Sequence, residues 1–300
     1  MFLYNIVDVN EKIIAVIPVF NEENSIFEIL DKVSSYCDEI IVINDGSSDR
    51  SIEKIIDFKK LDKKHIEIIE NKKNYGIGYS VKKGFELALK NGAEIVLKID
   101  ADGQHDPDDI PKFIKLINDS NLDLVKGNRF FDAESIQNMP KIKIFGNLIT
   151  TNIQKIISGN YKLSDPNNGF LAVRASKLQS INFNILNNQY FFENSLLVVF
   201  TALDFKIGEI GIQTIYRDEK SSIPILTASI KLLPVFISLL FKKNSIRAFQ
   251  KLSINSLIFY IGVLLLVINI YLNNIIFWFV FSILIVIYLL IDIVNFYRQN

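Results

Sequence analysis

The chain has 300 residues, which is enough for one large domain with an accessory part. Its 33 basic and 33 acidic residues balance, so no overall charge favours nucleic acid as a partner. The single cysteine, Cys37, cannot form an internal disulfide, and no CxxC motif or Cys/His cluster is present to hold zinc or an iron–sulfur centre. The first residues, Met1–Asn5, lack the pattern of a signal peptide, and we expect none.

Short apolar runs alternate with amphipathic stretches along most of the chain. The apolar runs predict buried strands at 13–18, 39–44, 66–70, 95–99, 122–126 and 206–216, with a further strand entered from the polar turn at 165–169. Apolar residues spaced three and four apart predict helices between them, at about 26–33, 51–62, 79–91, 107–118, 142–157 and 190–203. This alternation predicts an α/β fold with a mostly parallel, Rossmann-like sheet flanked by helices.

Three polar clusters, at 18–22, 45–49 and 100–104, each come just after a predicted strand. In open α/β sheets, ligands bind beyond the carboxyl ends of the strands. We therefore expect the three clusters to meet in one crevice, although they are far apart in the sequence.

The third cluster carries the clearest chemistry. Asp100 and Asp102 are two residues apart, so in an extended chain they project to the same side, with Gln104 and Asp106 close behind. Two convergent carboxylates repel each other unless a cation lies between them, and oxygen ligands suit Mg2+ or Mn2+. The alternative is an acidic surface turn, since Asp and Gly are common in turns. The expected convergence of the clusters favours the metal site.

Other nucleotide sites are not indicated. The chain has no GxxxxGK[ST] loop, and Gly76, Gly78 and Gly84 do not have the spacing of a dinucleotide fingerprint. Arg129 and Arg217 are the best candidates for contacting phosphate, because a guanidinium offers a rigid bidentate fork. Each could instead form an ordinary ion pair at the surface.

Taken together, these segments resemble the family 2 glycosyltransferases of the GT-A fold, specifically the branch of polyprenyl-phosphate sugar synthases such as dolichol-phosphate mannose synthase. The resemblance covers about the first 220 residues and rests on the order and spacing of the segments 16–22, 44–49, 100–105, 127–130 and 168–170. It implies an inverting enzyme that uses a nucleotide-sugar donor and a divalent cation.

The resemblance also implies roles for individual residues. The base, ribose and diphosphate of the donor would be held by Pro18, Phe20, Glu22, Asp45, Asp100 and Ala101. The metal would be bound by Asp100, Asp102 and Gln104. Asp102, Arg129 and Arg217 would act in catalysis, with the arginines on phosphates of donor or acceptor. The family often has Asp at the position of Asn44, which leaves Asp45 as the carboxylate there.

The acceptor decides whether a base is needed. A polyprenyl phosphate, dolichyl or undecaprenyl, is already largely ionised near neutral pH, because the second pKa of a phosphate monoester is about 6. A saccharide acceptor would instead need a carboxylate to take the proton of its hydroxyl, and Glu193 is the candidate, unless it is only a polar residue at the start of a helix. A third alternative is a non-catalytic membrane protein that binds nucleotide sugar, which the intact Asp100, Asp102 and Arg129 disfavour.

The carboxyl-terminal part indicates a membrane. Residues 252–291 carry no charge, and as one helix they would extend about 60 Å against a hydrocarbon core of about 30 Å. We therefore expect a hairpin of two transmembrane helices, 252–272 and 275–291, turning at Asn273–Asn274. Packing of these helices against copies of themselves would give a homo-oligomer.

Basic residues set the expected orientation. Four precede the apolar hairpin and Arg298 follows it, so the positive-inside rule places the catalytic part in the cytoplasm, on the inner or plasma membrane. For 223–241 we expect helices that lie in the membrane interface and break near Pro234; the alternative is a third span. The expected organisation is a catalytic domain at 1–220, interfacial helices at 221–248 and the hairpin at 249–300.

Overall fold

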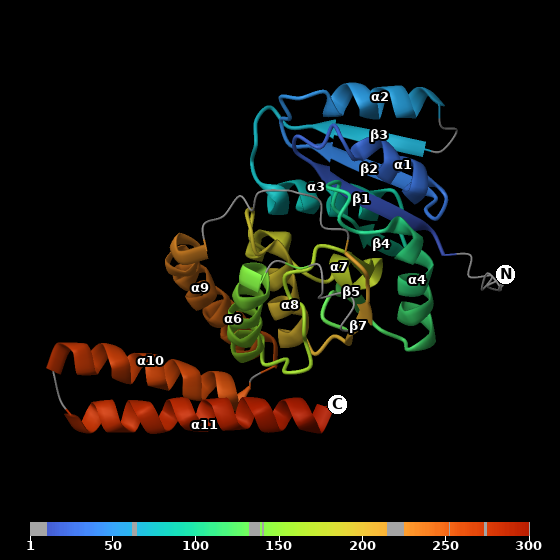
Figure 1. The fold of residues 1–300 in the computed structure, drawn as a ribbon. Coiled ribbons are helices and arrows are strands. Elements are labelled where there is room, and N and C mark those ends of the chain that lie inside the picture. Colours follow the sequence, from blue (N-terminus) through green and yellow to red (C-terminus); the bar gives the residue numbers. More distant parts are fainter. Residues whose placement is uncertain are drawn as a thin grey trace. The chain divides into compact units, whose positions relative to one another are not determined.

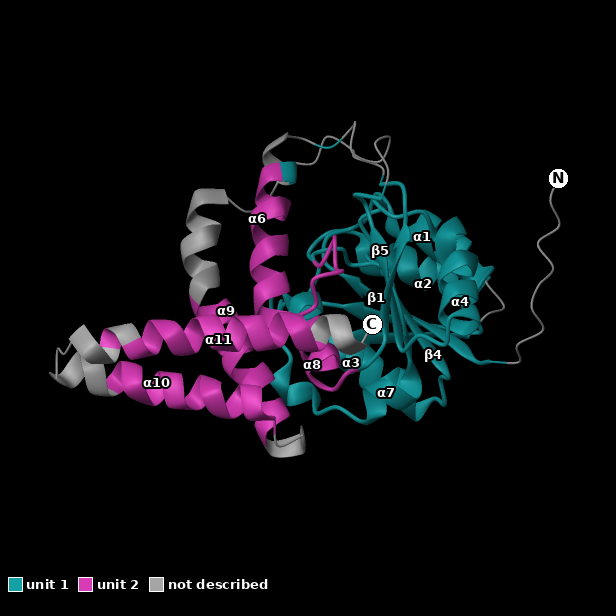
Figure 2. Ribbon diagram, turned by 90° about the horizontal axis from the view of Figure 1, so that it is seen from below, with its two compact units in different colours: residues 1–144, 167–195, 205–220 teal, residues 145–166, 196–204, 221–300 magenta. Residues whose placement is uncertain are grey.

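The computed structural model describes residues 11–61, 65–131, 139, 141–214, 225–251, 253–272 and 275–299. The chain packs as two compact units, which Figure 2 colours separately. Unit 1 consists of Met1–Ile144, Asn167–Ser195 and Phe205–Lys220, and unit 2 of Phe145–Pro166, Leu196–Asp204 and Ser221–Asn300.

Unit 1 is built on a mixed sheet. In the part of the chain that the structure describes, this sheet has seven strands in the order β3-β2-β1-β4-β6-β5-β7 (Figure 1). Their bounds are β1 Ile13–Val19, β2 Glu39–Asn44, β3 His65–Glu70, β4 Ile95–Lys98, β5 Leu124–Asn128, β6 Leu171–Arg174 and β7 Ile207–Gly211. Strands β1 to β4 are mutually parallel, as are β5 and β7, which confirms the mostly parallel sheet.

Strand β6 is the exception, because it runs antiparallel to both of its neighbours, β4 and β5. Leu171, at its start, is paired with Lys98 at the end of β4 and with Lys126 in β5. The chain just before β6 therefore lies at the same edge of the sheet as the chain that leaves β4 and β5. This reversal brings a fourth segment to the edge where the polar clusters were expected.

Helices pack on both faces of the sheet. The unit 1 helices are α1 Ile26–Ser34, α2 Ser51–Leu61, α3 Ile77–Lys90, α4 Ile110–Asp119 and α7 Ala175–Gln179, with the short 3-10 turns η1 Pro107–Asp109 and η2 Phe183–Ile185. Ala15, Ile17 and Val19 of β1 join one core with the buried faces of α1 and α4. On the other face, a Cβ at Gly84 of α3 would lie 2.3 Å from Val16 Cγ1, so this helix approaches β1 closely only because the residue is glycine.

Two further helices begin in unit 1 sequence and continue into unit 2: α6 Lys141–Ser158 and α8 Phe192–Ala202. Unit 2 also contains α9 Ile225–Lys251, α10 Ile254–Leu272 and α11 Ile275–Gln299. Figure 1 shows α10 and α11 side by side and running in opposite directions, as expected for a hairpin. The expected turn at Asn273–Asn274 lies outside the described residues.

One expectation for this part is corrected. Helix α9 runs through Pro234, so the expected break there is wrong. Pro234 is exposed and a proline removes a single backbone donor from a helix of 27 residues. Over the residues described, no helix is both long and apolar enough to cross a membrane.

Candidate active site

The expected site residues meet at one edge of the unit 1 sheet. Asp100, Ala101 and Asp102 directly follow β4, whose parallel neighbour β1 leads into the loop at 20–24. Because β6 is antiparallel, the turn containing Asn168 and Gly169 arrives at the same edge. The convergence predicted from the sequence is therefore present for β1, β2 and β4, and the segment before β6 joins it through a reversal that the sequence did not reveal.

A fully buried lysine holds the first of the two aspartates. Lys98 Nζ lies 2.6 Å from Asp100 Oδ1 and 2.8 Å from Glu193 Oε1. Burial lowers the pKa of Lys98, but the two carboxylates outweigh it and the pKa is raised overall. Burial raises the pKa of Asp100, but the Lys98 ammonium and other nearby groups outweigh burial and lower this pKa overall, so the carboxyl is ionised at neutral pH. Sequence reasoning missed Lys98, although a lysine inside a strand buried on both faces signals a buried partner.

The backbone at Gly169 completes the surroundings of Asp100. A Cβ at this glycine would lie 1.7 Å from Asp100 Oδ2 and 2.7 Å from Lys98 Nζ, so no larger residue fits without displacing the carboxylate. A second fully buried lysine, Lys126, donates to the carbonyl oxygen of Asn168 in the same turn. The buried ammonium groups of Lys98 in β4 and Lys126 in β5 thus both lie next to the chain segments that surround Asp100.

The loop after β4 presents Asp102 and Gln104 half-buried. Asp102 Oδ1 accepts a hydrogen bond from the backbone N–H of Gln104 at 2.9 Å, and Gly103 takes the left-handed conformation, with φ 72°. Ser25 Oγ donates to the carbonyl oxygen of Ala101 at 2.6 Å, which ties the loop to the start of α1. Hydrogen bonds within the loop and to Ser25 therefore fix its backbone conformation, and the side chains of Asp102 and Gln104 lie partly exposed at the edge of the sheet.

The loops after β1 and β2 are joined to each other. The backbone N–H of Asn21 donates to Ser47 Oγ at 3.0 Å, and Asn21 Oδ1 accepts from the N–H of Ser48 at 2.8 Å. Around this junction Pro18 is buried, Glu22 is half-buried, and the ring of Phe20 is 44% exposed. An exposed aromatic ring beside the site is suited to stack on a flat ring of a ligand.

Asp45 is buried and already engaged. Its Oδ1 accepts from Asn71 Nδ2 at 2.8 Å and from the N–H of Tyr75 at 3.0 Å, and its Oδ2 accepts from the N–H of Gly76 at 2.8 Å. The carboxylate thus holds the loop between β3 and α3 in place. Its contact with the donor, expected from the resemblance, stays a prediction. Neighbouring Asn44 accepts from the N–H of Ser47 at 3.1 Å and so shapes the turn without a charge.

The structure describes Arg129, one of the two arginines that were expected to contact phosphate. Arg129 directly follows β5 and is half-buried, which places it at the site edge. Arg217 lies outside the described residues. The chain that leads toward it does reach the acidic loop, because His105 forms an isolated antiparallel bridge with Thr214. His105 itself is buried, with its ring centroid 5.7 Å from that of Phe170.

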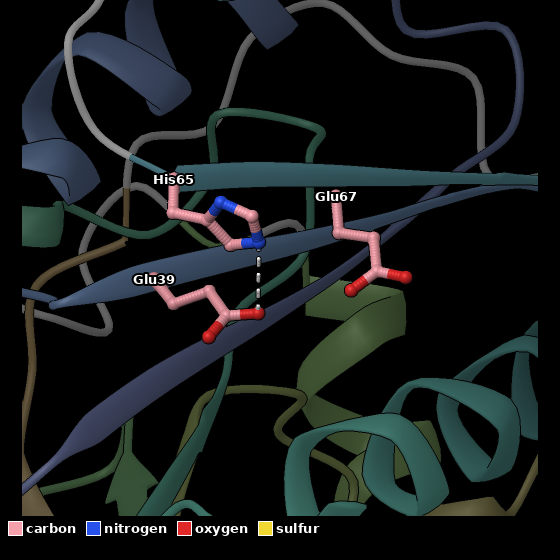
Figure 3. A group of neighbouring side chains, drawn as sticks. All are labelled: Glu39, His65 and Glu67. Carbon is pink, nitrogen blue, oxygen red and sulfur yellow. Dashed lines mark ion pairs between the residues drawn. The ribbon is translucent and has the colours of Figure 1, made fainter. Parts of the chain in front are cut away.

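A different group of possible metal ligands lies at the opposite edge, at the amino ends of β2 and β3. Figure 3 shows Glu39, His65 and Glu67 facing one another there. Lys12 Nζ lies 3.2 Å from Glu39 Oε2, and Asn91 Nδ2 donates to both glutamates. A lysine and an amide therefore already satisfy these carboxylates. Asp100 and Asp102 form no such group of three with other described acids, histidines or cysteines.

Comparison with known proteins decides the family. Residues 14–181 match the sequence profile described as glycosyl transferase family 2. The chain belongs to this family. A glycosyltransferase of Methanococcus voltae, UDP-N-acetylglucosamine–dolichyl-phosphate N-acetylglucosaminyltransferase, is 31% identical over 68% of this chain and 85% of its own. The polyprenol monophosphomannose synthase of Mycolicibacterium smegmatis is 22% identical over 67% of this chain and 80% of its own.

Solved glycosyltransferase structures show the fold. Glucosyl-3-phosphoglycerate synthase from Mycobacterium tuberculosis, in complex with Mn2+, UDP-glucose and phosphoglyceric acid, matches with a TM-score of 0.59 and 17% identity, covering 78% of this chain and 80% of its own. This similarity confirms the GT-A fold predicted from the sequence. That enzyme binds Mn2+ together with its nucleotide sugar.

Proposed function

We propose that this family 2 glycosyltransferase moves a sugar from a nucleotide-sugar donor onto a polyprenyl phosphate, with inversion at the anomeric carbon. The observation that carries the proposal is the acidic loop with Asp100 and Asp102 at the carboxyl end of β4, backed by buried lysines. The acceptor is supported by the relatives, whose names include transferases to dolichyl phosphate and to polyprenol phosphate. Both relatives align over about two thirds of this chain.

The donor would lie along the edge of the sheet. Exposed Phe20 is suited to stack on the base, while Pro18 and Glu22 line the same loop. The diphosphate would reach the loop of Asp100, Ala101 and Asp102, which its hydrogen bonds to Ser25 and Gln104 hold in shape. A site fixed in this way loses little free energy to reorganisation when the donor binds.

The donor set fits Mg2+ or Mn2+. Asp100 is ionised, Asp102 and Gln104 offer further oxygens, and the net charge of Lys98, Asp100, Glu193 and Asp102 is negative. When bound, such an ion would neutralise the negative charge that develops on the leaving diphosphate. The rest of its coordination would come from the diphosphate and water.

The acceptor phosphate would enter near the end of β5, where Arg129 is available to orient it. Arg217 is proposed for the same role on the strength of the resemblance alone. Attack by an ionised phosphate oxygen needs no base, since no proton has to be removed. Attack on the face opposite the diphosphate inverts the anomeric configuration.

A lipid acceptor implies association with a membrane, and unit 2 supports it. Helix α10 exposes a stripe of large apolar side chains spaced three and four residues apart, at least 43% exposed each, namely Ile254, Leu257, Ile261 and Leu264. Helix α11 exposes further ones, including Trp278, Val286 and Leu290. Exposed apolar surface of this extent is typical of sites that bind a membrane or another protein.

The proposal is tested by transfer of radiolabelled sugar into organic-extractable lipid. Purified protein is incubated with polyprenyl phosphate, Mn2+ or Mg2+ and a panel of labelled nucleotide sugars. We expect one donor to label the lipid phase in the presence of metal and none to do so with EDTA. The productive donor also identifies the sugar and the base.

The matched variants are Asp102→Asn and Asp57→Asn. Asn at 102 keeps the acceptor for the Gln104 N–H and removes only the charge, so we expect folding to persist and transfer to fall at least about 100-fold. Asp57 is an exposed residue of α2 and its variant should transfer normally. If no donor labels lipid while the protein binds UDP or GDP with Mn2+, the lipid acceptor is wrong, and saccharide acceptors become the hypothesis.

A further inference from the structure

The buried ion pair behind the acidic loop raises the question of what Glu193 does. Glu193 is 95 residues away from Lys98 in the sequence and lies in the first turn of α8. Its side chain is only 11% exposed, and its Oε1 lies 2.8 Å from Lys98 Nζ. The ammonium of Lys98 is fully buried between this carboxylate and that of Asp100.

The charges of this group do not balance within it. Lys98 carries one positive charge, while Asp100 and Glu193 each carry a negative one. The other buried cation, Lys126, donates to the carbonyl oxygen of Asn168, and its effect on Asp100 is smaller than that of Lys98. If Lys98 had Asp100 as its sole partner, the pair would be neutral and Asp100 would have little attraction left for a cation. Because Glu193 also contacts Lys98, the positive charge of the lysine is shared between two carboxylates. The electrostatic potential at Asp100 therefore stays negative. A charged hydrogen bond in this low-dielectric position is strong, so the sharing has a large effect.

Position is constrained as well as charge. Lys98 contacts Asp100 Oδ1, and the backbone of Gly169 packs against Oδ2. The carboxylate is therefore held from both sides, and Lys98 is itself held by Glu193. Outer partners of this kind orient metal ligands in many proteins.

We infer that Glu193 is a positioning residue that takes up the charge of Lys98 and so keeps Asp100 available to a divalent cation, and that it is not a general base. This inference rests on the proposed function for the identity of the site. It excludes the role of base that Glu193 would have with a saccharide acceptor, because a carboxylate held against a buried ammonium is poorly placed to accept a proton from a sugar hydroxyl.

The test is the affinity for Mn2+ in the presence of saturating UDP, measured by the electron paramagnetic resonance signal of free Mn2+. Glu193→Gln keeps the shape of the side chain and removes its charge. We expect the affinity for Mn2+ to fall about 10- to 100-fold, the usual effect of losing an outer partner. Transfer should fall at low Mn2+ and recover at saturating Mn2+. Glu86→Gln on the exposed side of α3 is the matched control and should change neither measurement.

A second substitution makes the inference specific. When Glu193 is replaced by Gln, the positive charge of Lys98 is paired with Asp100 alone. Adding Lys98→Met removes that positive charge, so Asp100 is again free to attract a cation. We expect this double variant to regain most of the lost Mn2+ affinity. A merely structural role for Glu193 would give the double variant a still weaker site, because it would lose two buried contacts.

Other outcomes overturn the inference. If Glu193→Gln binds Mn2+ as tightly as the natural protein and yet loses transfer at every Mn2+ concentration, Glu193 is a base. If that variant does not fold, Glu193→Asp carries the same test: it retains the charge but retracts from Lys98, and unchanged Mn2+ affinity would count against positioning. Since Mn2+ binding needs no acceptor, a weakened site in a protein that labels no lipid would refute the lipid acceptor and leave the positioning role standing.

Discussion

Each unit of the protein has a completely buried lysine in an ion pair with an aspartate, and these two lysines have opposite surroundings. Lys98 in unit 1 contacts two carboxylates, whereas Lys243 in unit 2 contacts one, Asp292, at 2.8 Å. Asp292 also pairs with Arg247. Burial lowers the pKa of Lys243 to about 8, and Asp292 only partly offsets this effect, while the pKa of Lys98 is raised. The ratio of acids to bases around a buried lysine therefore decides the direction in which its pKa shifts.

The ratio of acidic to basic side chains also differs between the group around Lys98 and the group around Lys243. The group around Lys98 has an excess of acid and lies at the edge of the sheet, where we propose that a cation binds. The group around Lys243 has an excess of base, and its carboxylate also accepts from Asn255 Nδ2 at 3.2 Å. That group joins α9, α10 and α11 to one another, which is a structural task. A glycine stands against the carboxylate in both groups, Gly169 in one and Gly159 in the other.

The largest expected difference between the two groups comes from removing each lysine. Lys98→Met leaves Asp100 and Glu193 facing each other without a cation, and we expect it to reduce the free energy of unfolding by about 3 to 5 kcal/mol. Lys243→Met leaves Asp292 with Arg247 and Asn255, so its loss should be less than half as large. Urea titrations followed by circular dichroism give both values. Equal losses would contradict the comparison.

Next in size is the effect of filling the two glycines. Gly169→Ala should displace Asp100 and reduce sugar transfer by at least about 10-fold, since its Cβ would lie 1.7 Å from the carboxylate. Gly159→Ala should destabilise unit 2 by about 1 kcal/mol or more without changing Mn2+ affinity. Gly92 is the control, because its φ is 77° and an added Cβ would have no atom within 4 Å. Gly92→Ala therefore measures the cost of the left-handed backbone conformation alone. Mn2+ binding and thermal unfolding separate the three variants.

A smaller effect concerns pH. A folded pKa of about 8 for Lys243 lies below its ordinary value of 10.5, so between these values the unfolded chain binds more protons. Stability contributed by this group should therefore rise as the pH increases from about 8 to 10. Lys98, whose pKa is raised, contributes fully below pH 10.5 and gives no such rise. Urea midpoints at pH 7.5, 9 and 10 should show the rise in the natural protein and a flatter profile in Lys243→Met.

The smallest expected change concerns the exposed apolar stripe of unit 2. Replacing Leu257 and Leu264 by serine should lower the recovery of the protein with phospholipid vesicles in a flotation gradient, because each removes apolar surface that is about 60% exposed. Leu61 of α2 in unit 1 is 75% exposed, and Leu61→Ser is the matched control with no expected effect. Equal recovery of all variants would exclude the stripe as a membrane contact.

Much of the site was predictable because it depends on local pattern. The strand before Asp100, the acidic loop and the loops after β1 and β2 follow from apolar runs that end in polar residues. Partners distant in the sequence were not predictable in this way. Lys98 and Glu193 meet only because α8 returns to the end of β4, and the contacts that occupy Asp45 come from a loop 26 to 31 residues further on.

The carboxyl-terminal part shows a different reason for error. Pro234 suggested a break, yet a long helix tolerates the loss of one hydrogen bond at an exposed position. The pairing of α10 with α11 was nevertheless predictable, since a long apolar segment with two central asparagines favours a hairpin.

The reversed direction of β6 constrains how the length of this chain can vary. Leu171 is in register with both Lys98 and Lys126, and Gly169 stands against Asp100 two residues earlier. A one-residue insertion between Gly169 and Leu171 would place a different residue, bearing a side chain, against that carboxylate. In the turn that enters β6, an insertion or deletion that keeps these contacts therefore has to fall before Asn168, whose carbonyl oxygen accepts from Lys126. A change in loop length there can alter the surroundings of the site while leaving the contacts of Asp100 intact.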